Sequence, residues 1–107
     1  MHRGDIRWYT FADPDKRRPV LLITRESMIR RLNEVTVLGI TTTIRNLDSE
    51  VRLTHADGMP TDCVINCDQI QTLPRHRIGE LVTRLNDAKL EELESALLYA
   101  MGFKTYK

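Results

Sequence analysis

The sequence lacks any long hydrophobic run. Of its 107 residues, 41% are hydrophobic and 29% are charged, which is typical of a globular domain. The longest apolar runs, such as residues 20–23, are far too short to span a bilayer, and no apolar signal segment follows the first five residues. We therefore expect residues 1–107 to form a single cytoplasmic domain with one modest core.

Cysteine and histidine are also scarce. The two cysteines, Cys63 and Cys67, have a C-x3-C spacing, and no second pair completes a tetrahedral site. We expect two buried thiols rather than a metal or redox site, and no cofactor. The three histidines, His2, His55 and His76, do not form an evident acid–base pair, so we expect them on the surface.

Basic and acidic residues are almost equal in number. Sixteen basic residues face fifteen acidic ones, for a net charge of +1, whereas a protein held to nucleic acid mainly by counterion release usually carries a larger basic excess. The charge is nevertheless uneven. The first third of the chain contains Arg3, Arg7, Lys16, Arg17, Arg18, Arg25, Arg30 and Arg31, and the last quarter contains Asp87, Glu91, Glu92 and Glu94. This asymmetry allows a local basic face.

Aromatic residues make up only 6% of the chain. Trp8, Tyr9 and Phe11 lie in one predicted strand, where alternation sends Trp8 to one face and the other two to the opposite face. One set therefore belongs to the core, and either could offer a stacking surface to an unpaired base. The sequence alone leaves open which set is buried.

Short β-rich segments separated by turns predict a mainly β, α+β domain. We expect strands at residues 4–11, 19–24, 35–44 with a bend at Gly39, 50–54, 63–67, 70–73 and 80–85. Residues 12–15 and 46–49 predict turns, residues 26–33 about two helical turns, residues 55–60 a loop and residues 74–78 a helical turn. A final helix capped by Asn86 or Asp87 carries the apolar stripe Leu90, Leu93, Leu97 and Ala100 and stops at Gly102. So many short strands favour a small, partly open antiparallel barrel.

The clearest chemical signal is an arginine placed directly before a proline at the start of an apolar strand. Pro19 favours extended geometry at Arg18, and a cluster of threonine hydroxyls, residues 41–43, ends the third expected strand. Because a guanidinium offers a fork of donors that matches phosphate oxygens, this pairing suits phosphate binding. Alternatively, Arg18 caps a sheet edge or pairs with Asp15, and the threonines are ordinary β-formers.

Four segments, in order, resemble the MazF/PemK toxin family of toxin–antitoxin modules. They are Arg3-Gly4-Asp5-Ile6, residues 17–23 (RRPVLLI), Ile40-Thr41-Thr42 and residues 66–73 (NCDQIQTL). The resemblance implies the SH3-like, partly open antiparallel barrel that the family shares with CcdB toxins, with short helices and a C-terminal helix. It also implies a homodimer, a cognate antitoxin, and sequence-selective, metal-independent cleavage of single-stranded mRNA that leaves a 2′,3′-cyclic phosphate and a 5′-hydroxyl.

The same resemblance implies roles for individual residues. RNA transesterification needs a base for the 2′-hydroxyl, stabilisation of a phosphorane and a proton for the leaving oxygen. Arg18 matches the catalytic arginine and would stabilise the phosphorane, and Thr41 matches the catalytic threonine. Asp68 matches a carboxylate that serves as base in part of the family; alternatively, it only bonds its own backbone in a turn. The candidate RNA-binding residues are Lys16, Arg17, Thr42 and Asn66.

Two departures from the family pattern bear on function. The segment between the first two strands, residues 12–16, is short and has no glycine, and Asn66 stands where one branch carries a second catalytic arginine. Two alternatives therefore remain: a gyrase-poisoning toxin on the same fold, and a small SH3-like binding module. The Arg-Pro-Val and Ile-Thr-Thr motifs favour the nuclease, and the low aromatic content disfavours the module.

Overall fold

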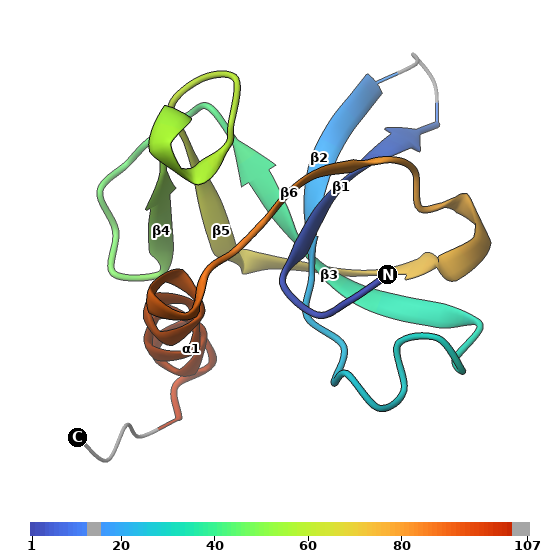
Figure 1. Ribbon diagram of the computed structural model, residues 1–107. Coiled ribbons are helices and arrows are strands. Elements are labelled where there is room, and N and C mark those ends of the chain that lie inside the picture. Colours follow the sequence, from blue (N-terminus) through green and yellow to red (C-terminus); the bar gives the residue numbers. More distant parts are fainter. Residues whose placement is uncertain (13–15, 104–107) are drawn as a thin grey trace.

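Six antiparallel strands form a strongly curved sheet, with one α-helix at the C-terminal end (Figure 1). The computed structural model describes residues 1–12 and 16–103. The strands are β1 Asp5–Phe11, β2 Lys16–Leu22, β3 Glu34–Thr41, β4 Glu50–Leu53, β5 Cys63–Pro74 and β6 Leu81–Arg84, and the helix is α1 Asp87–Met101. Two 3₁₀-helices, η1 His55–Asp57 and η2 Arg75–Arg77, follow β4 and β5. The order in the sheet is β4-β5-β3-β2-β1-β6, which confirms the predicted mainly β, partly open barrel with short helices.

The long strand β5 joins the two halves of the curved sheet. Its first part pairs with both β4 and β3, and its second part pairs with β3 alone. The register jumps from Leu38 opposite Ile70 to Gly39 opposite Asn66, so residues 67–69 have no partner on β3. This bulge lies opposite the predicted bend at Gly39 and bends the sheet there. The two strands expected around it are one continuous strand, β5.

Hydrophobic cores lie on both faces of the sheet. The first lies between the sheet and α1 and includes Ile6, Leu21, Leu38, Ile40, Leu53, Ile65 and Leu93. The second lies on the opposite face and comprises Tyr9, Val20, Leu22, Ile29, Val35, Val37 and Leu73. Because successive side chains of a strand alternate, the run Val20–Leu22 supplies both cores. This explains why the second strand reads as continuously apolar rather than alternating.

The C-terminal helix begins and ends where its sequence predicts. Asn86 is the N-cap, and its Oδ1 accepts a hydrogen bond of 2.9 Å from the Lys89 N–H. Gly102 ends the helix in the left-handed region with a φ of 76°. Leu93 and Ala96 are buried, and the rest of the stripe packs against the same core. The helix lies against β4 and β5 (Figure 1). Within the described ranges, no helix has the length and apolar character needed to cross a membrane.

Three local predictions differ from the structure. Residues 26–33 form hydrogen-bonded turns instead of a helix, since the bonds at Met28 and Arg31 reach back three residues and only Leu32 bonds four residues back. The third strand ends at Thr41, because its Oγ1 accepts the Thr43 N–H at 3.1 Å and turns the chain out of the sheet. The second strand already begins at residue 16. Most of the turn expected at residues 12–15 lies outside the described residues.

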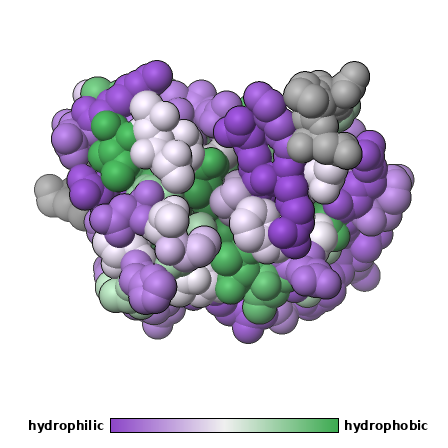
Figure 2. Space-filling model, turned by 90° about the horizontal axis from the view of Figure 1, so that it is seen from above, coloured by the Kyte–Doolittle hydropathy of each residue, from purple (hydrophilic) through white to green (hydrophobic). Residues whose placement is uncertain are grey.

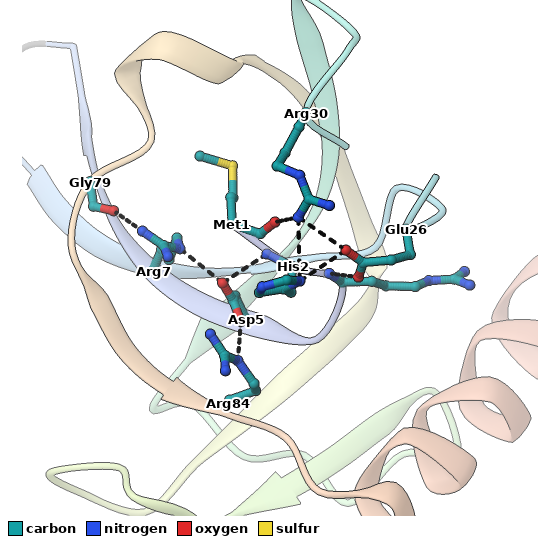
Figure 3. Close-up of polar contacts among 9 residues, drawn as sticks. Met1, His2, Asp5, Arg7, Glu26, Arg30, Gly79 and Arg84 are labelled. Carbon is teal, nitrogen blue, oxygen red and sulfur yellow. Dashed lines mark hydrogen bonds and ion pairs between the residues drawn. The ribbon is translucent and has the colours of Figure 1, made fainter. Parts of the chain in front are cut away.

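A buried carboxylate ties the N-terminus to the sheet. Asp5 is fully buried, and it accepts hydrogen bonds from Arg84 Nε at 2.7 Å, Arg7 Nε at 3.1 Å and the His2 N–H at 3.0 Å (Figure 3). Burial alone would raise the pKa of this carboxyl, but the hydrogen bonds from Arg84, His2 and Arg7 together hold it below its usual value. His2 is exposed, as predicted, and its Nδ1 lies 2.9 Å from Glu26.

Candidate active site

A cleft of about 480 Å³ opens where β2, β3 and β5 meet the loop that follows β3. Its polar lining comprises Lys16, Arg18, Thr41, Thr43, Arg45, Glu50, Asn66, Gln69 and Gln71. Four of the seven residues predicted as catalytic or RNA-binding are therefore brought together here: Lys16, Arg18, Thr41 and Asn66.

The face of the molecule seen from above in Figure 2 carries several separate hydrophobic patches between hydrophilic side chains.

Positive charge dominates the cleft. Lys16, Arg18 and Arg45 line it, and none of the three makes an ion pair with a described residue. The carboxylate of Glu50 also lines it, but Glu50 Oε1 accepts the backbone N–H groups of Arg45 at 3.1 Å and Leu47 at 3.3 Å. The cleft therefore suits an anionic ligand with several charges, such as a phosphodiester chain. Asp15, the alternative partner of Arg18, lies outside the described residues.

Strand alternation decides which basic side chains of β2 reach the cleft. Lys16 and Arg18 point to the face that carries it, whereas Arg17 points to the other face. There the Arg17 guanidinium carbon lies 4.3 Å from the centre of the Trp8 ring, a cation–π contact. The structure therefore does not place Arg17, a predicted RNA-binding residue, in the cleft.

The threonine cluster divides in the same way. Thr41 and Thr43 line the cleft, while Thr42 is exposed outside it. Since Thr41 Oγ1 already accepts the Thr43 N–H, its own O–H remains to donate to a ligand oxygen; no other hydrogen bond ties it within the described part of the chain. Thr41 thus lines the same cleft as Arg18, and Thr43 lines it instead of Thr42.

The predicted base adjoins the cleft but does not line it. Asp68 is in the bulge of β5, and its Oδ2 accepts a hydrogen bond of 2.6 Å from Ser49 Oγ. It is not among the described residues that line the cleft. Asn66, which does line it, has its Oδ1 engaged by the Asp68 N–H at 3.0 Å. The amide NH₂ of Asn66 has no partner among the described residues and can donate to a ligand.

The sequence did not indicate several cleft residues. Gln69 lies across Gly39, where a Cβ would overlap Gln69 Oε1 and come within 2.8 Å of its Cδ. In the sequence, only the glycine at position 39 inside a predicted strand indicated that another group approaches the backbone closely there. Gln71 and Arg45 stand in no recognisable pattern. Phe11 completes the apolar wall and meets Tyr9 edge-on with ring centres 4.8 Å apart.

The aromatic, cysteine and histidine predictions have clear outcomes. Tyr9 is buried, whereas Trp8 and Phe11 are half-buried on opposite faces. Both cysteines are free and buried, as predicted. Burial, and next the charge of Asp68, raises the pKa of the Cys67 thiol to about 11. His2, His55 and His76 are exposed, as predicted, and none lines the cleft. Within residues 1–12 and 16–103, no group of three His, Cys, Asp or Glu residues could hold a metal ion.

The protein is thus a small half-barrel with a basic cleft that hydroxyl groups line. The family described as "PemK-like, MazF-like toxin of type II toxin-antitoxin system" matches residues 2–101. The chain therefore belongs to the PemK/MazF family of toxins of type II toxin–antitoxin systems.

Several similar proteins come from Mycobacterium tuberculosis. "Probable endoribonuclease MazF2" of Mycobacterium tuberculosis is 41% identical over 103 residues, covering 95% of this chain and 99% of that protein. "Endoribonuclease MazF3" of the same organism is 41% identical over 91 residues, covering 85% and 84%. The solved structure of "Mycobacterium tuberculosis toxin MazF-mt6" superimposes with a TM-score of 0.86 at 33% identity, over 94% of this chain and 99% of that chain.

Proposed function

We propose that this toxin is an endoribonuclease that cleaves single-stranded mRNA in the cleft between β2, β3 and β5. Two curated relatives at 41% identity are named endoribonucleases. The observation that carries the proposal is the joint position of Arg18 and Thr41 in a cleft with an excess of positive charge. A guanidinium and a hydroxyl there can grip the phosphate that is to be cleaved.

The proposed reaction is transesterification. The 2′-oxygen attacks the adjacent phosphorus, its proton passes to a base, and a phosphorane dianion forms. The bond to the 5′-oxygen then breaks, and this oxygen takes up a proton. Arg18 stabilises the negative charge of the phosphorane, and the Thr41 O–H donates to one of its oxygens. Arg18 acts by its permanent positive charge rather than as a proton donor.

The cleft needs no metal ion for this chemistry in our proposal. Lys16, Arg18 and Arg45 supply the positive charge that stabilises the transition state and binds neighbouring phosphates. Asn66 and Gln71 offer amide groups that can bond to base edges, and Phe11 offers a ring for stacking. We assign sequence selectivity to these three residues, because the segment that joins β1 to β2 is only residues 12–15.

The partners follow from the family. A similar fold at 24% identity and a TM-score of 0.86 belongs to a structure titled "Endoribonuclease in complex with its cognate antitoxin from Mycobacterial species". We propose that this toxin likewise has a cognate antitoxin, which blocks RNA from the cleft, and that it forms a homodimer. We expect it to act in the cytoplasm, where mRNA is translated.

End-group analysis of the RNA products tests the proposal. The purified toxin is incubated in excess EDTA with several long, unrelated single-stranded RNAs. We expect discrete fragments that end in a 2′,3′-cyclic phosphate and begin with a 5′-hydroxyl. Intact RNA in every case would refute the proposal, and a parallel gyrase supercoiling assay would then test the gyrase-poisoning alternative.

A further inference from the structure

The loop between β3 and β4, residues 42–49, supplies two of the side chains that line the cleft. Thr43 and Arg45 both come from this loop, and they line the same cleft as Lys16 and Arg18. The loop has no regular secondary structure of its own. Its position, and hence the place of the Arg45 charge, must therefore come from specific contacts at its ends.

Ser49 fixes the C-terminal end of the loop to the bulge in β5. This serine is 3% exposed, and its Oγ donates to Asp68 Oδ2 at 2.6 Å. Its carbonyl oxygen accepts the N–H of Cys67 at 2.9 Å. Two consecutive residues of the bulge thus hold one residue of the loop from both its side chain and its backbone. A hydrogen bond to a charged carboxylate is among the stronger kinds in proteins.

Glu50, the next residue, continues the connection into the loop. Its Oε1 accepts the backbone N–H groups of Arg45 and Leu47 at 3.1 and 3.3 Å. Asn46, between them, has a positive φ of 57° and accepts a hydrogen bond from Arg52 at 3.1 Å. The backbone of Arg45 is therefore fixed relative to residues 49 and 50, so a displacement of Ser49 displaces Arg45.

The bulge places Asp68 and Gln69 in different roles. Because residues 67–69 have no partner on β3, they escape the alternation that pairing imposes. Gln69 turns over Gly39 into the cleft, whereas Asp68 bonds to Ser49 outside it. The carboxylate is thus next to the site but directed at the loop.

We infer that Asp68 is a positioning residue that acts through Ser49 to hold Thr43 and Arg45 in the cleft, and that it is not the base of the reaction. The inference deepens the proposed function and rests on it. With the anchor broken, Arg45 no longer meets the RNA phosphates at a fixed place, so substrate binding weakens. The chemical step at Arg18 and Thr41 is affected less.

Four variants separate an anchor from a base: Asp68→Asn, Asp68→Ala, Ser49→Ala and the double variant Ser49→Ala/Asp68→Ala. Asp48→Ala, which removes an exposed carboxylate from the same loop, is the matched control. Asparagine keeps an oxygen that can accept the Ser49 O–H but cannot take up a proton at neutral pH. For an anchor we expect Asp68→Asn to keep kcat within a few-fold.

We expect Asp68→Ala and Ser49→Ala each to raise KM roughly tenfold, with a smaller fall in kcat and an unchanged pH profile. The double variant should be no worse than either single one, because both changes break the same contact. A fall of about 10²–10⁴-fold in kcat for Asp68→Asn, the loss expected for a missing general base, would overturn the inference. So would additive effects of Ser49→Ala and Asp68→Ala.

A second measurement does not depend on RNA cleavage. Trypsin can cut after Arg45 once the loop leaves its contacts. We expect faster cutting there in Ser49→Ala and Asp68→Ala than in the wild-type protein, measured by mass spectrometry against the cutting rate after Arg31, and wild-type rates in Asp68→Asn and Asp48→Ala. Equal rates in all variants would overturn the anchor. If the wild-type protein does not cut RNA, the proposed function fails while this test of the anchor still gives an answer.

Discussion

Replacing Asp5 by asparagine should destabilise the whole domain. The variant removes the charge that faces two arginines in a site with no exposure of the carboxylate. Breaking a buried ion pair typically costs about 3–5 kcal/mol. Because the Arg84 side chain is 53% exposed, water takes over part of its solvation, and we expect the lower value of about 2–3 kcal/mol.

Thermal and chemical unfolding measure this loss. For a domain of this size, about 2–3 kcal/mol corresponds to a fall in Tm of roughly 10–15 °C. The matched control is Glu26→Gln, which removes an exposed carboxylate that also bonds to the N-terminal segment, at His2 (Figure 3). We expect its Tm to stay close to that of the wild-type protein.

The stability that Asp5 contributes should also depend on pH in a definite direction. The pKa of Asp5 is lowered in the folded protein, so its contribution is complete above the ordinary value near 3.8 and is lost as the pH falls through the lowered value. The stability difference between wild type and Asp5→Asn should therefore be constant from pH 5 upward and shrink in more acidic solution. Equal stability at neutral pH, or a difference that widens in acid, would show that the Asp5 carboxylate does not stabilise the fold.

Three further predictions concern the cleft and its surroundings. Gly39→Ala should displace the flexible Gln69 side chain, so that RNA cleavage falls while the free energy of unfolding changes by less than about 1 kcal/mol; a large loss of stability would contradict this. Cys67, with its pKa raised to about 11, should react with iodoacetamide at pH 8 only as fast as the protein unfolds, and fast labelling of the folded protein would contradict its burial. Binding to a non-cleavable RNA weakens with salt, and Lys16→Ala should reduce the slope of log K against log salt concentration by about 0.7. Arg17→Ala, on the other strand face, should leave this slope nearly unchanged.

Short-range patterns predicted the parts of the fold and the site that depend on neighbouring residues. Pro19 fixes the geometry around Arg18, and alternation along a strand was enough to pair Tyr9 with Phe11 on one face. Asn86 and Gly102 likewise predicted the two ends of α1. These features depend only on residues close together in the sequence, so the sequence was enough to predict them.

Tertiary features decided the rest. An unpaired segment of three residues, 67–69, breaks the alternation of β5, so the direction of Asp68 could not be inferred from its neighbours. A single contact from the Thr41 side chain ended β3 earlier than its β-branched sequence indicates. Arg45 reaches the cleft through a loop whose shape depends on contacts with β4 and β5. No local pattern marks such a residue as part of a site.

In our proposal the cleavage of RNA in this cleft depends on Arg18, and a single-turnover rate tests this dependence. The rate constant for cutting one RNA in excess EDTA is measured for the wild type, Arg18→Ala, Arg18→Lys and the control Arg31→Ala, which removes an exposed arginine outside the cleft. We predict a loss of about 10²–10³-fold in Arg18→Ala, partial recovery in Arg18→Lys because the charge returns without the fork, and a wild-type rate in Arg31→Ala. Undiminished cleavage by folded Arg18→Ala would show that Arg18 is not the residue on which cleavage depends.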